Sequence, residues 1–283
     1  MNESLPGNVV SDIVRRALAE DLGGRGDVTT CATVPEAACG RFRLVARQAG
    51  VLSGVQAANE VFAQVDPDIE IEWHEVDGGW FETGAVLADL TGPAAGILTA
   101  ERTVLNFLGR LSGIATLTRR YVDAVAGTGA RIAHTRKTTP GLRALELQAV
   151  VAGGGARHRF GLDDAILIKD NHVAVVGSVG EAVRRARAFA GHMLRVAAEI
   201  DSLDQLDEVL DAGVDSILLD NFSHAELRQA VLKSRGRGVV LEASGKVSLE
   251  SVDRVAATGI DVISIGALTH SAPCLDLGLD EHV

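Results

Sequence analysis

The densest group of side chains that could do chemistry lies between residues 133 and 172 of this 283-residue chain. Cations outnumber acids there, although the whole chain has a formal net charge of −11. Guanidinium groups bind carboxylates and phosphates through paired hydrogen bonds, and the Gly153-Gly154-Gly155 run lets backbone approach a ligand closely. A single arginine is usually a solvated surface residue, but this cluster predicts a site for a ligand with several negative charges. Its cations are Arg136, Lys137, Arg143, Arg157, His158, Arg159 and Lys169.

Five apolar runs in the second half of the chain each end in a polar residue and lead into a helical segment. They recur roughly every 20 to 30 residues, the spacing of βα units. Uninterrupted apolar runs are typical of parallel strands buried on both faces, and the carboxyl ends of barrel strands converge on one pocket. An open doubly wound sheet would gather these ends less closely. We therefore expect one pocket at the run ends, which carry Lys169, Glu199, Asp220, Glu242 with Ser244, and Ser264 with Gly266.

The first half of the chain has a different pattern. The apolar spacing predicts a helix over 11–22, capped by Ser11 and stopped at Gly23. Short β-like runs separated by turns follow between about residues 40 and 90, and a second helix is predicted over 99–125, interrupted at Ser112-Gly113.

These patterns predict an α/β protein of two domains. A smaller N-terminal α/β sandwich domain is expected over residues 1–112, and a TIM-like α/β barrel, complete or incomplete, over residues 113–268. The C-terminal tail, 269–283, is expected to pack on the N-terminal domain.

Composition excludes several classes of protein. Hydrophobic residues at 47% and charged residues at 23% are typical of a folded globular protein. The acidic net charge argues against partners such as nucleic acid or an acidic membrane surface. We find neither a signal-like start nor an apolar stretch of about 18 residues. Three cysteines without a CxxC pair favour a cytoplasmic location with free, buried thiols.

Several longer motifs in the chain resemble those of the quinolinate phosphoribosyltransferase family. They are ERTVLNFLGRLSGIAT, TRKTTPGLR, GGG followed by HR, LIKDNH, EIDSLDQL, ILLDN, LEASG and ISIGALTHSAP. The similarity runs from GDVTT, near Asp27, almost to the C-terminus. It implies a pentosyltransferase of de novo NAD (pyridine nucleotide) biosynthesis that converts quinolinate and phosphoribosyl pyrophosphate to nicotinate mononucleotide, pyrophosphate and CO₂, with Mg²⁺ as cofactor.

The resemblance also implies roles for individual residues. Arg102, Arg136 and Arg159 would bind the quinolinate carboxylates, helped by His158 and Lys169. Lys137 would bind pyrophosphate, beside Thr135, while Glu199 and Asp220 would bind the ribose hydroxyls and, directly or indirectly, Mg²⁺. Catalytic roles are implied for Lys137, Lys169, Glu199 and Asp220. The 5′-phosphate would be bound by the turns containing Ser244, Gly245, Lys246, Ile265, Gly266 and Ala267.

The sequence departs from the family pattern at two positions. His134 stands where relatives commonly have an acidic residue, which we expect to affect only a strand residue. Lys246 stands where they commonly have Gly or Asn, and it either contacts a phosphate or points to solvent. In the family the small domain of one subunit closes the barrel of its partner, so Arg102 is expected to act across a homodimer interface, whether or not dimers assemble further.

Three rival functions remain open at this stage. One is another type II phosphoribosyltransferase or the molybdenum-transport paralogue, although His158-Arg159 favours the quinolinate enzyme. A barrel lyase would use Lys169 as a Schiff-base nucleophile and would need a pKa-lowering environment around it. A non-catalytic anion-binding protein would bind its ligands without releasing pyrophosphate.

Overall fold

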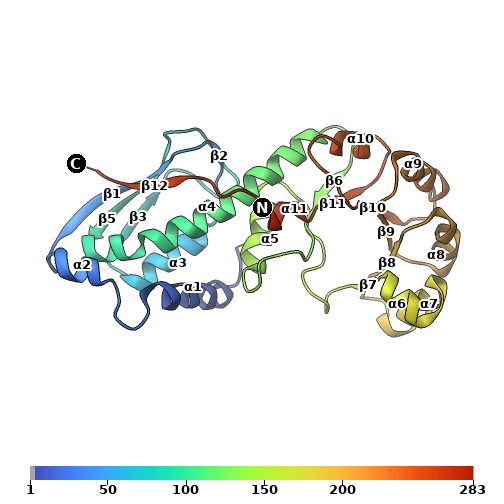
Figure 1. The fold of residues 1–283 in the computed structure, drawn as a ribbon, viewed down its shortest axis with the longest axis horizontal. Coiled ribbons are helices and arrows are strands. Elements are labelled where there is room, and N and C mark those ends of the chain that lie inside the picture. The colour runs from blue at the N-terminus through green and yellow to red at the C-terminus, as the bar shows by residue number, and fades with distance from the viewer. Residues whose placement is uncertain (1–3, 283) are drawn as a thin grey trace. The chain divides into compact units, whose positions relative to one another are not determined.

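The computed structural model describes residues 4–282, and it forms two compact units. Residues 1–3, at the start of the predicted N-terminal domain, and residue 283, at the end of the predicted tail, lie outside the described residues. The first unit comprises residues 1–119, 138–154 and 267–283, and the second comprises 120–137 and 155–266. The first contains an antiparallel sheet and the second a parallel sheet with helices, so the predicted α/β class is confirmed (Figure 1). The predicted boundary at residue 112 differs from this division, which assigns residues 138–154 to the first unit.

The first unit is built on an antiparallel sheet with strand order β12-β1-β5-β3 among the described residues. The C-terminal strand β12 pairs with β1, with Leu44 opposite Leu279. Buried side chains of the sheet, such as Leu44 and Leu90, and of the helices, such as Val14 and Phe62, form its core. Its elements are α1 (Gly7–Leu22), α2 (Val28–Thr33), β1 (Cys39–Ala46), β2 (Gly50–Val51), α3 (Val55–Val65), β3 (Glu70–Trp73), β4 (Trp80–Phe81), β5 (Val86–Pro93), α4 (Ala94–Ala124, of which 120–124 belong to the second unit), α5 (Arg143–Ala152), α11 (Ala267–His270) and β12 (Leu277–Glu281).

Helix α4 is continuous, so the predicted interruption at Ser112-Gly113 is wrong. The glycine serves a close approach instead. A Cβ on Gly113 would lie 1.9 Å from the carbonyl oxygen of Pro273, and one turn earlier the carbonyl of Gly109 accepts the backbone N–H of Leu275. Small residues therefore let the segment before β12 lie directly on the helix. Ser112 is buried and exchanges hydrogen bonds with the backbone of Ser53.

Two smaller expectations for the first unit are corrected. Helix α1 begins at Gly7, directly after Pro6, so Ser11 lies inside the helix, where its Oγ accepts a hydrogen bond from Gln64. The helix ends at Gly23, as predicted. The three cysteines are free but exposed rather than buried: Cys31 lies in the short helix α2, Cys39 begins β1, and Cys274 lies in the segment before β12.

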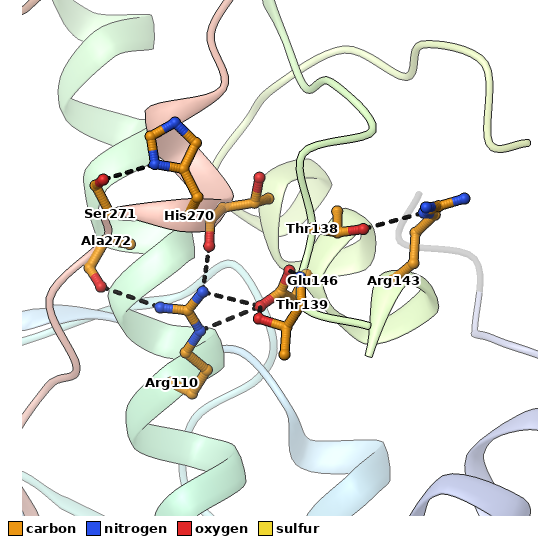
Figure 2. Close-up of polar contacts among 9 residues, drawn as sticks. Arg110, Thr138, Thr139, Arg143, Glu146, His270, Ser271 and Ala272 are labelled. Atoms are coloured by element: carbon orange, nitrogen blue, oxygen red, sulfur yellow. Dashed lines mark hydrogen bonds and ion pairs between the residues drawn. The ribbon is translucent and has the colours of Figure 1, made fainter. Parts of the chain in front are cut away.

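A buried ion pair connects α4, α5 and the loop before α5 in the first unit. Glu146 is fully buried and accepts hydrogen bonds from Nε and Nη2 of Arg110, at 3.2 and 2.9 Å (Figure 2). It also accepts the backbone N–H and the hydroxyl of Thr139, at 2.9 and 2.8 Å. Arg110 in turn donates to the carbonyls of Thr269 and Ala272, at the end of α11 and just beyond it. Through Glu146, this network ties Thr139 of the TRKTTPGLR motif to Arg110 of the long helix.

The second unit is a curved parallel sheet with strand order β6-β11-β10-β9-β8-β7 among the described residues. Helices α7 to α10 lie along its outer side (Figure 1). Buried side chains occur along all of its strands, as expected for strands covered on both faces, and include Ile132, Ile168, Ile217 and Ile263. Its elements are β6 (Arg131–Ala133), β7 (Ile166–Ile168), α6 (Asp170–Val176), α7 (Val179–Ala190), β8 (Val196–Ile200), η1 (Leu203–Gln205), α8 (Leu206–Ala212), β9 (Ser216–Asp220), α9 (His224–Lys233), β10 (Val240–Ser244), α10 (Val252–Ala256) and β11 (Val262–Ser264).

Candidate active site

The carboxyl ends of the parallel strands surround a cavity of about 400 Å³ in the second unit. Strand register explains which side chains meet there. Leu218 of β9 is opposite Glu199 of β8 and Glu242 of β10, and Asp220 is opposite Ser244. Because side chains alternate across a strand, residues two apart face the same side. The cavity is lined by His134, Thr135, Arg136, Lys137, His158, Arg159, Leu167, Lys169, Glu199, Leu218, Asp220, Glu242, Ser244 and Ser264.

Two arginines in the cavity have unused hydrogen-bonding capacity. The Nε atoms of Arg136 and Arg159 are buried and have no hydrogen-bond partner among the described residues. Burial, followed by the nearby charge of Arg136, lowers the pKa of Arg159 from its ordinary value. Arg159 also donates from Nη1 to the carbonyl of Ala165, 3.1 Å away. Buried, unpaired donors cost free energy, so this arrangement suits an anion that accepts from both guanidinium groups.

The remaining charges provide acidic groups beside the cations. Lys169, at the end of β7, donates a hydrogen bond to Glu199 Oε2. Asp220 Oδ2 accepts from the side chain of Asn221, 2.7 Å away. Counting Glu242, the lining residues include three Asp or Glu side chains and four Lys or Arg side chains, the latter being Arg136, Lys137, Arg159 and Lys169. Lys169 therefore has a charged partner and lies among other charges, which differs from the apolar pocket of a typical Schiff-base lysine.

His158 connects three parts of the cavity wall. Its Nδ1 accepts the backbone N–H of Arg159 at 2.8 Å, and its Nε2 lies 3.2 Å from Glu242 Oε2. Its own backbone N–H donates to Nε2 of His134 at 3.0 Å. Because Nδ1 of His158 is an acceptor, the ring proton lies on Nε2 and is donated to Glu242. This segment has no regular secondary structure, so side chains hold it in place.

The turn after β10 packs tightly against the end of β9. Gly245 has a φ of 98°, and a Cβ there would lie 2.3 Å from Asn221 Oδ1. The backbone N–H of Asn221 donates to the Ser244 carbonyl at 2.9 Å. Lys246 follows with a φ of 51°, a left-handed conformation that favours glycine or asparagine, and it is exposed. Backbone strain at Lys246 is thus stored next to the strand ends.

The cavity brings together most of the residues expected to form the site, but not all. Gly245, Lys246, Ile265 and Gly266 belong to the second unit without lining the cavity, whereas Ala267 and Arg102 belong to the first unit. Glu242 and Ser264 line the cavity, where the run ends were expected to meet, whereas sequence reasoning gave no site role to His134, Leu167 and Leu218, which also line it. The period-two pattern could have pointed to Leu167 and Leu218, which precede Lys169 and Asp220 by two positions.

Residues 4–282 contain neither a ready-made metal site nor a membrane-spanning helix. We find no group of three or more His, Cys, Asp or Glu side chains placed to hold a metal ion by themselves. In the same residues, no helix combines the length and the apolar character needed to cross a membrane.

His172 has a structural position. It follows Lys169 by one helical turn, and its Nδ1 accepts the backbone N–H of Lys169 at 2.9 Å, at the start of α6. This hydrogen bond gives His172 a structural role at the start of the helix.

Comparison with known proteins identifies similar chains over nearly the full length. Residues 27–112 match the N-terminal domain model of quinolinate phosphoribosyl transferase, and residues 114–280 match the C-terminal domain model. The nicotinate-nucleotide pyrophosphorylase (carboxylating) of Mycobacterium leprae is 48% identical over 95% of this chain and 96% of its own. A probable enzyme of the same name from Bacillus subtilis is 44% identical over 92% and 89%. The solved nicotinate-nucleotide pyrophosphorylase of Francisella tularensis has a TM-score of 0.95 at 38% identity, covering 100% and 99% of the two chains.

Proposed function

Because this chain belongs to the quinolinate phosphoribosyltransferase family, we propose that the cavity in the second unit is where quinolinate and phosphoribosyl pyrophosphate react. The chain catalyses the decarboxylating transfer that forms nicotinate mononucleotide in NAD biosynthesis. The observation that supports this location best is the pair of buried Nε donors on Arg136 and Arg159, which lack a hydrogen-bond partner within residues 4–282. Quinolinate has two adjacent carboxylates, and two guanidinium groups can bind them through several hydrogen bonds.

Phosphoribosyl pyrophosphate brings a second set of anions to the same cavity. Lys137 is exposed at the cavity wall and supplies a cation for the pyrophosphate group. The backbone N–H groups of the turn at Ser244 to Lys246 are the donors that we assign to the 5′-phosphate. Asp220 and Glu199 are acceptors suited to the ribose hydroxyls.

The carboxylates Glu199 and Asp220 also fit a magnesium site that is completed by substrate. Both line the cavity, and magnesium is commonly bound by one or two carboxylates together with substrate phosphates and waters. When bound, Mg²⁺ would neutralise charge on the pyrophosphate.

The proposed chemistry follows from the placement of these charges. The bond from C1′ to the pyrophosphate oxygen breaks, and Lys137 stabilises the charge on the leaving group. Glu199 and Asp220 hold the electron-poor ribose while the pyridine nitrogen forms its bond to C1′. The resulting pyridinium withdraws electrons from C2, so the bond to the C2 carboxylate breaks, CO₂ leaves and C2 takes up a proton. We assign Lys169 and His158, which line the cavity, to orienting that carboxylate.

A direct assay tests the proposed reaction. The purified protein is incubated with quinolinate, phosphoribosyl pyrophosphate and Mg²⁺, and CO₂ and nicotinate mononucleotide are measured. We expect the two products in equal amounts, and no product when EDTA replaces Mg²⁺. Nicotinate in place of quinolinate should react poorly because it lacks the second carboxylate. Comparable rates with both acids would contradict the proposed carboxylate recognition.

We also propose that Arg102 acts in the active site of a partner subunit. Arg102 is exposed on α4 in the first unit, whereas the cavity is lined by residues of the second. In a two-fold symmetric dimer, both subunits would exchange this residue equally. Closing the cavity would exclude water and strengthen its contacts with anions.

Subunit mixing tests this arrangement. Arg102→Ala and Lys137→Ala homodimers should each be nearly inactive. Hybrids formed from both would contain one intact site of two, and random exchange makes about half the dimers hybrids, so recovery of about a quarter of wild-type activity is expected. Exchange is verified with two differently tagged chains. No recovery despite exchange would place Arg102 outside the partner's site.

Three free cysteines support a reducing compartment, and we propose a cytoplasmic location for this chain. Export of the full-length protein fused to a reporter would argue against it.

A further inference from the structure

His134, which directly follows a strand, lines the cavity and contacts another cavity residue, His158. It follows β6 directly and precedes Thr135. Only 2% of its surface is exposed, and it lines the cavity. Its Nε2 accepts the backbone N–H of His158 at 3.0 Å, and the two rings meet edge to face with centroids 6.3 Å apart. The expectation that this position affects only a strand residue is therefore wrong.

The hydrogen bond determines the protonation state of the His134 ring. A nitrogen that accepts a hydrogen bond carries no proton, so the ring is neutral while this bond exists. Burial and the nearby His158 lower the pKa of His134 to about 4, which keeps it neutral near pH 7. An acidic residue at this position, which the family resemblance leads one to expect, could also accept the bond but would add a negative charge. His134 accepts it without weakening the attraction of the cavity for anions.

His134 holds the part of the chain that carries two substrate-binding residues. The backbone at His158 belongs to an irregular segment, and His158 also accepts the N–H of Arg159 and contacts Glu242. Losing the acceptor at His134 would leave the His158 N–H without this partner. The position of the neighbouring Arg159 guanidinium would then be less well defined.

We propose that His134 is a positioning residue for quinolinate binding, acting as the acceptor that fixes the His158-Arg159 segment. The inference rests on the proposed role of Arg159 in binding a quinolinate carboxylate. It deepens that role by identifying what sets the geometry of the arginine.

Three variants of His134 distinguish the effect of its hydrogen-bond acceptor from the effect of its side-chain volume. In His134→Gln the amide oxygen reaches about as far as the imidazole Nε2. In His134→Asn the same chemical group stops about one bond short, and His134→Leu has similar bulk but no acceptor. Steady-state kinetics with each substrate varied in turn gives separate KM values. Arg159→Ala is measured in parallel, and circular dichroism checks that each variant is folded.

We expect the Asn and Leu variants to raise the KM for quinolinate roughly tenfold, the usual effect of one unmade buried hydrogen bond. The KM for phosphoribosyl pyrophosphate should stay within about twofold, and Gln should restore quinolinate binding to within about threefold. Gln behaving like Leu, or equal rises in both KM values, would overturn the proposal. The proposal would also be overturned if the Asn and Leu variants had a normal KM for quinolinate while Arg159→Ala bound quinolinate poorly. A normal Arg159→Ala would instead refute the proposed carboxylate site itself. Because Asn and Gln are both polar and close in size, their comparison does not depend on folding of the Leu variant.

Discussion

Removing the carboxylate of Glu146 should destabilise the first unit strongly. Glu146 is fully buried and accepts four hydrogen bonds, two from Arg110 and two from Thr139. Glu146→Ala would leave a largely buried guanidinium without its counter-ion and the Thr139 N–H without its acceptor. Removing one partner of a buried pair typically costs about 3 to 5 kcal/mol.

The structure places the expected loss at the lower end of that range. The Arg110 side chain is 23% exposed and keeps the carbonyls of Thr269 and Ala272 as acceptors, so water and backbone compensate part of its charge. We therefore expect a loss of about 3 kcal/mol, or more than a hundredfold in the unfolding equilibrium constant. Glu146→Gln keeps an acceptor oxygen and should lose less.

Denaturant titration followed by tryptophan fluorescence measures this loss directly. Both tryptophans of the chain, Trp73 and Trp80, lie in the first unit, so the signal reports on the unit that contains Glu146. Protein concentration is held constant because association would shift the midpoint. The matched control is Asp12→Ala, which removes the acidic partner of Arg15 at the surface of the same unit. Its midpoint should stay within error of the parent. A Glu146→Ala midpoint equal to that of Asp12→Ala would refute the argument from burial.

Four further outcomes are expected. Arg136→Ala and Arg159→Ala should each lower kcat/KM for quinolinate, because each loses about 2 to 5 kcal/mol of binding free energy. Unchanged quinolinate kinetics would reject these assignments. Asp220→Ala should impair the use of phosphoribosyl pyrophosphate more than quinolinate binding, whereas equal losses in titrations with each ligand would indicate misfolding. Lys246→Gly should relieve the left-handed backbone strain and stabilise the protein by up to about 1 kcal/mol. It should also raise the KM for phosphoribosyl pyrophosphate. A lower melting temperature with unchanged kinetics would contradict both expectations. The pKa of His134 in the folded protein, about 4, lies below the ordinary histidine value of 6.5, so the unfolded chain binds the extra proton and stability falls as pH drops from 6.5 to 4. His134→Gln should lose less stability over that interval in thermal unfolding, and identical pH profiles would contradict it.

Sequence periodicity was sufficient to identify the parallel strands and the polar residues at their ends. The runs ending at Lys169, Glu199, Asp220 and Ser244 correspond to β7, β8, β9 and β10. Such strands are recognisable because burial on both faces requires uninterrupted apolar residues, which is a local property of the chain. The motifs alone also indicated the family, which the comparisons establish.

Tertiary packing decided features that no local pattern contains. Gly113 has the sequence signature of a helix interruption, yet α4 continues because the backbone at Pro273 occupies the space of a missing side chain. Ser11 is a good N-cap residue, but α1 starts earlier and its hydroxyl contacts Gln64 of α3.

The partners of His134 and Glu146 were equally invisible in the sequence. His134 accepts a bond from a residue 24 positions away, and Glu146 binds Arg110, 36 positions away. The sequence by itself determined where strands and cations occur, because these depend on side-chain type and spacing. Only the fold determined which buried polar groups satisfy one another, because a buried hydrogen bond requires two groups that meet in space regardless of their separation along the chain.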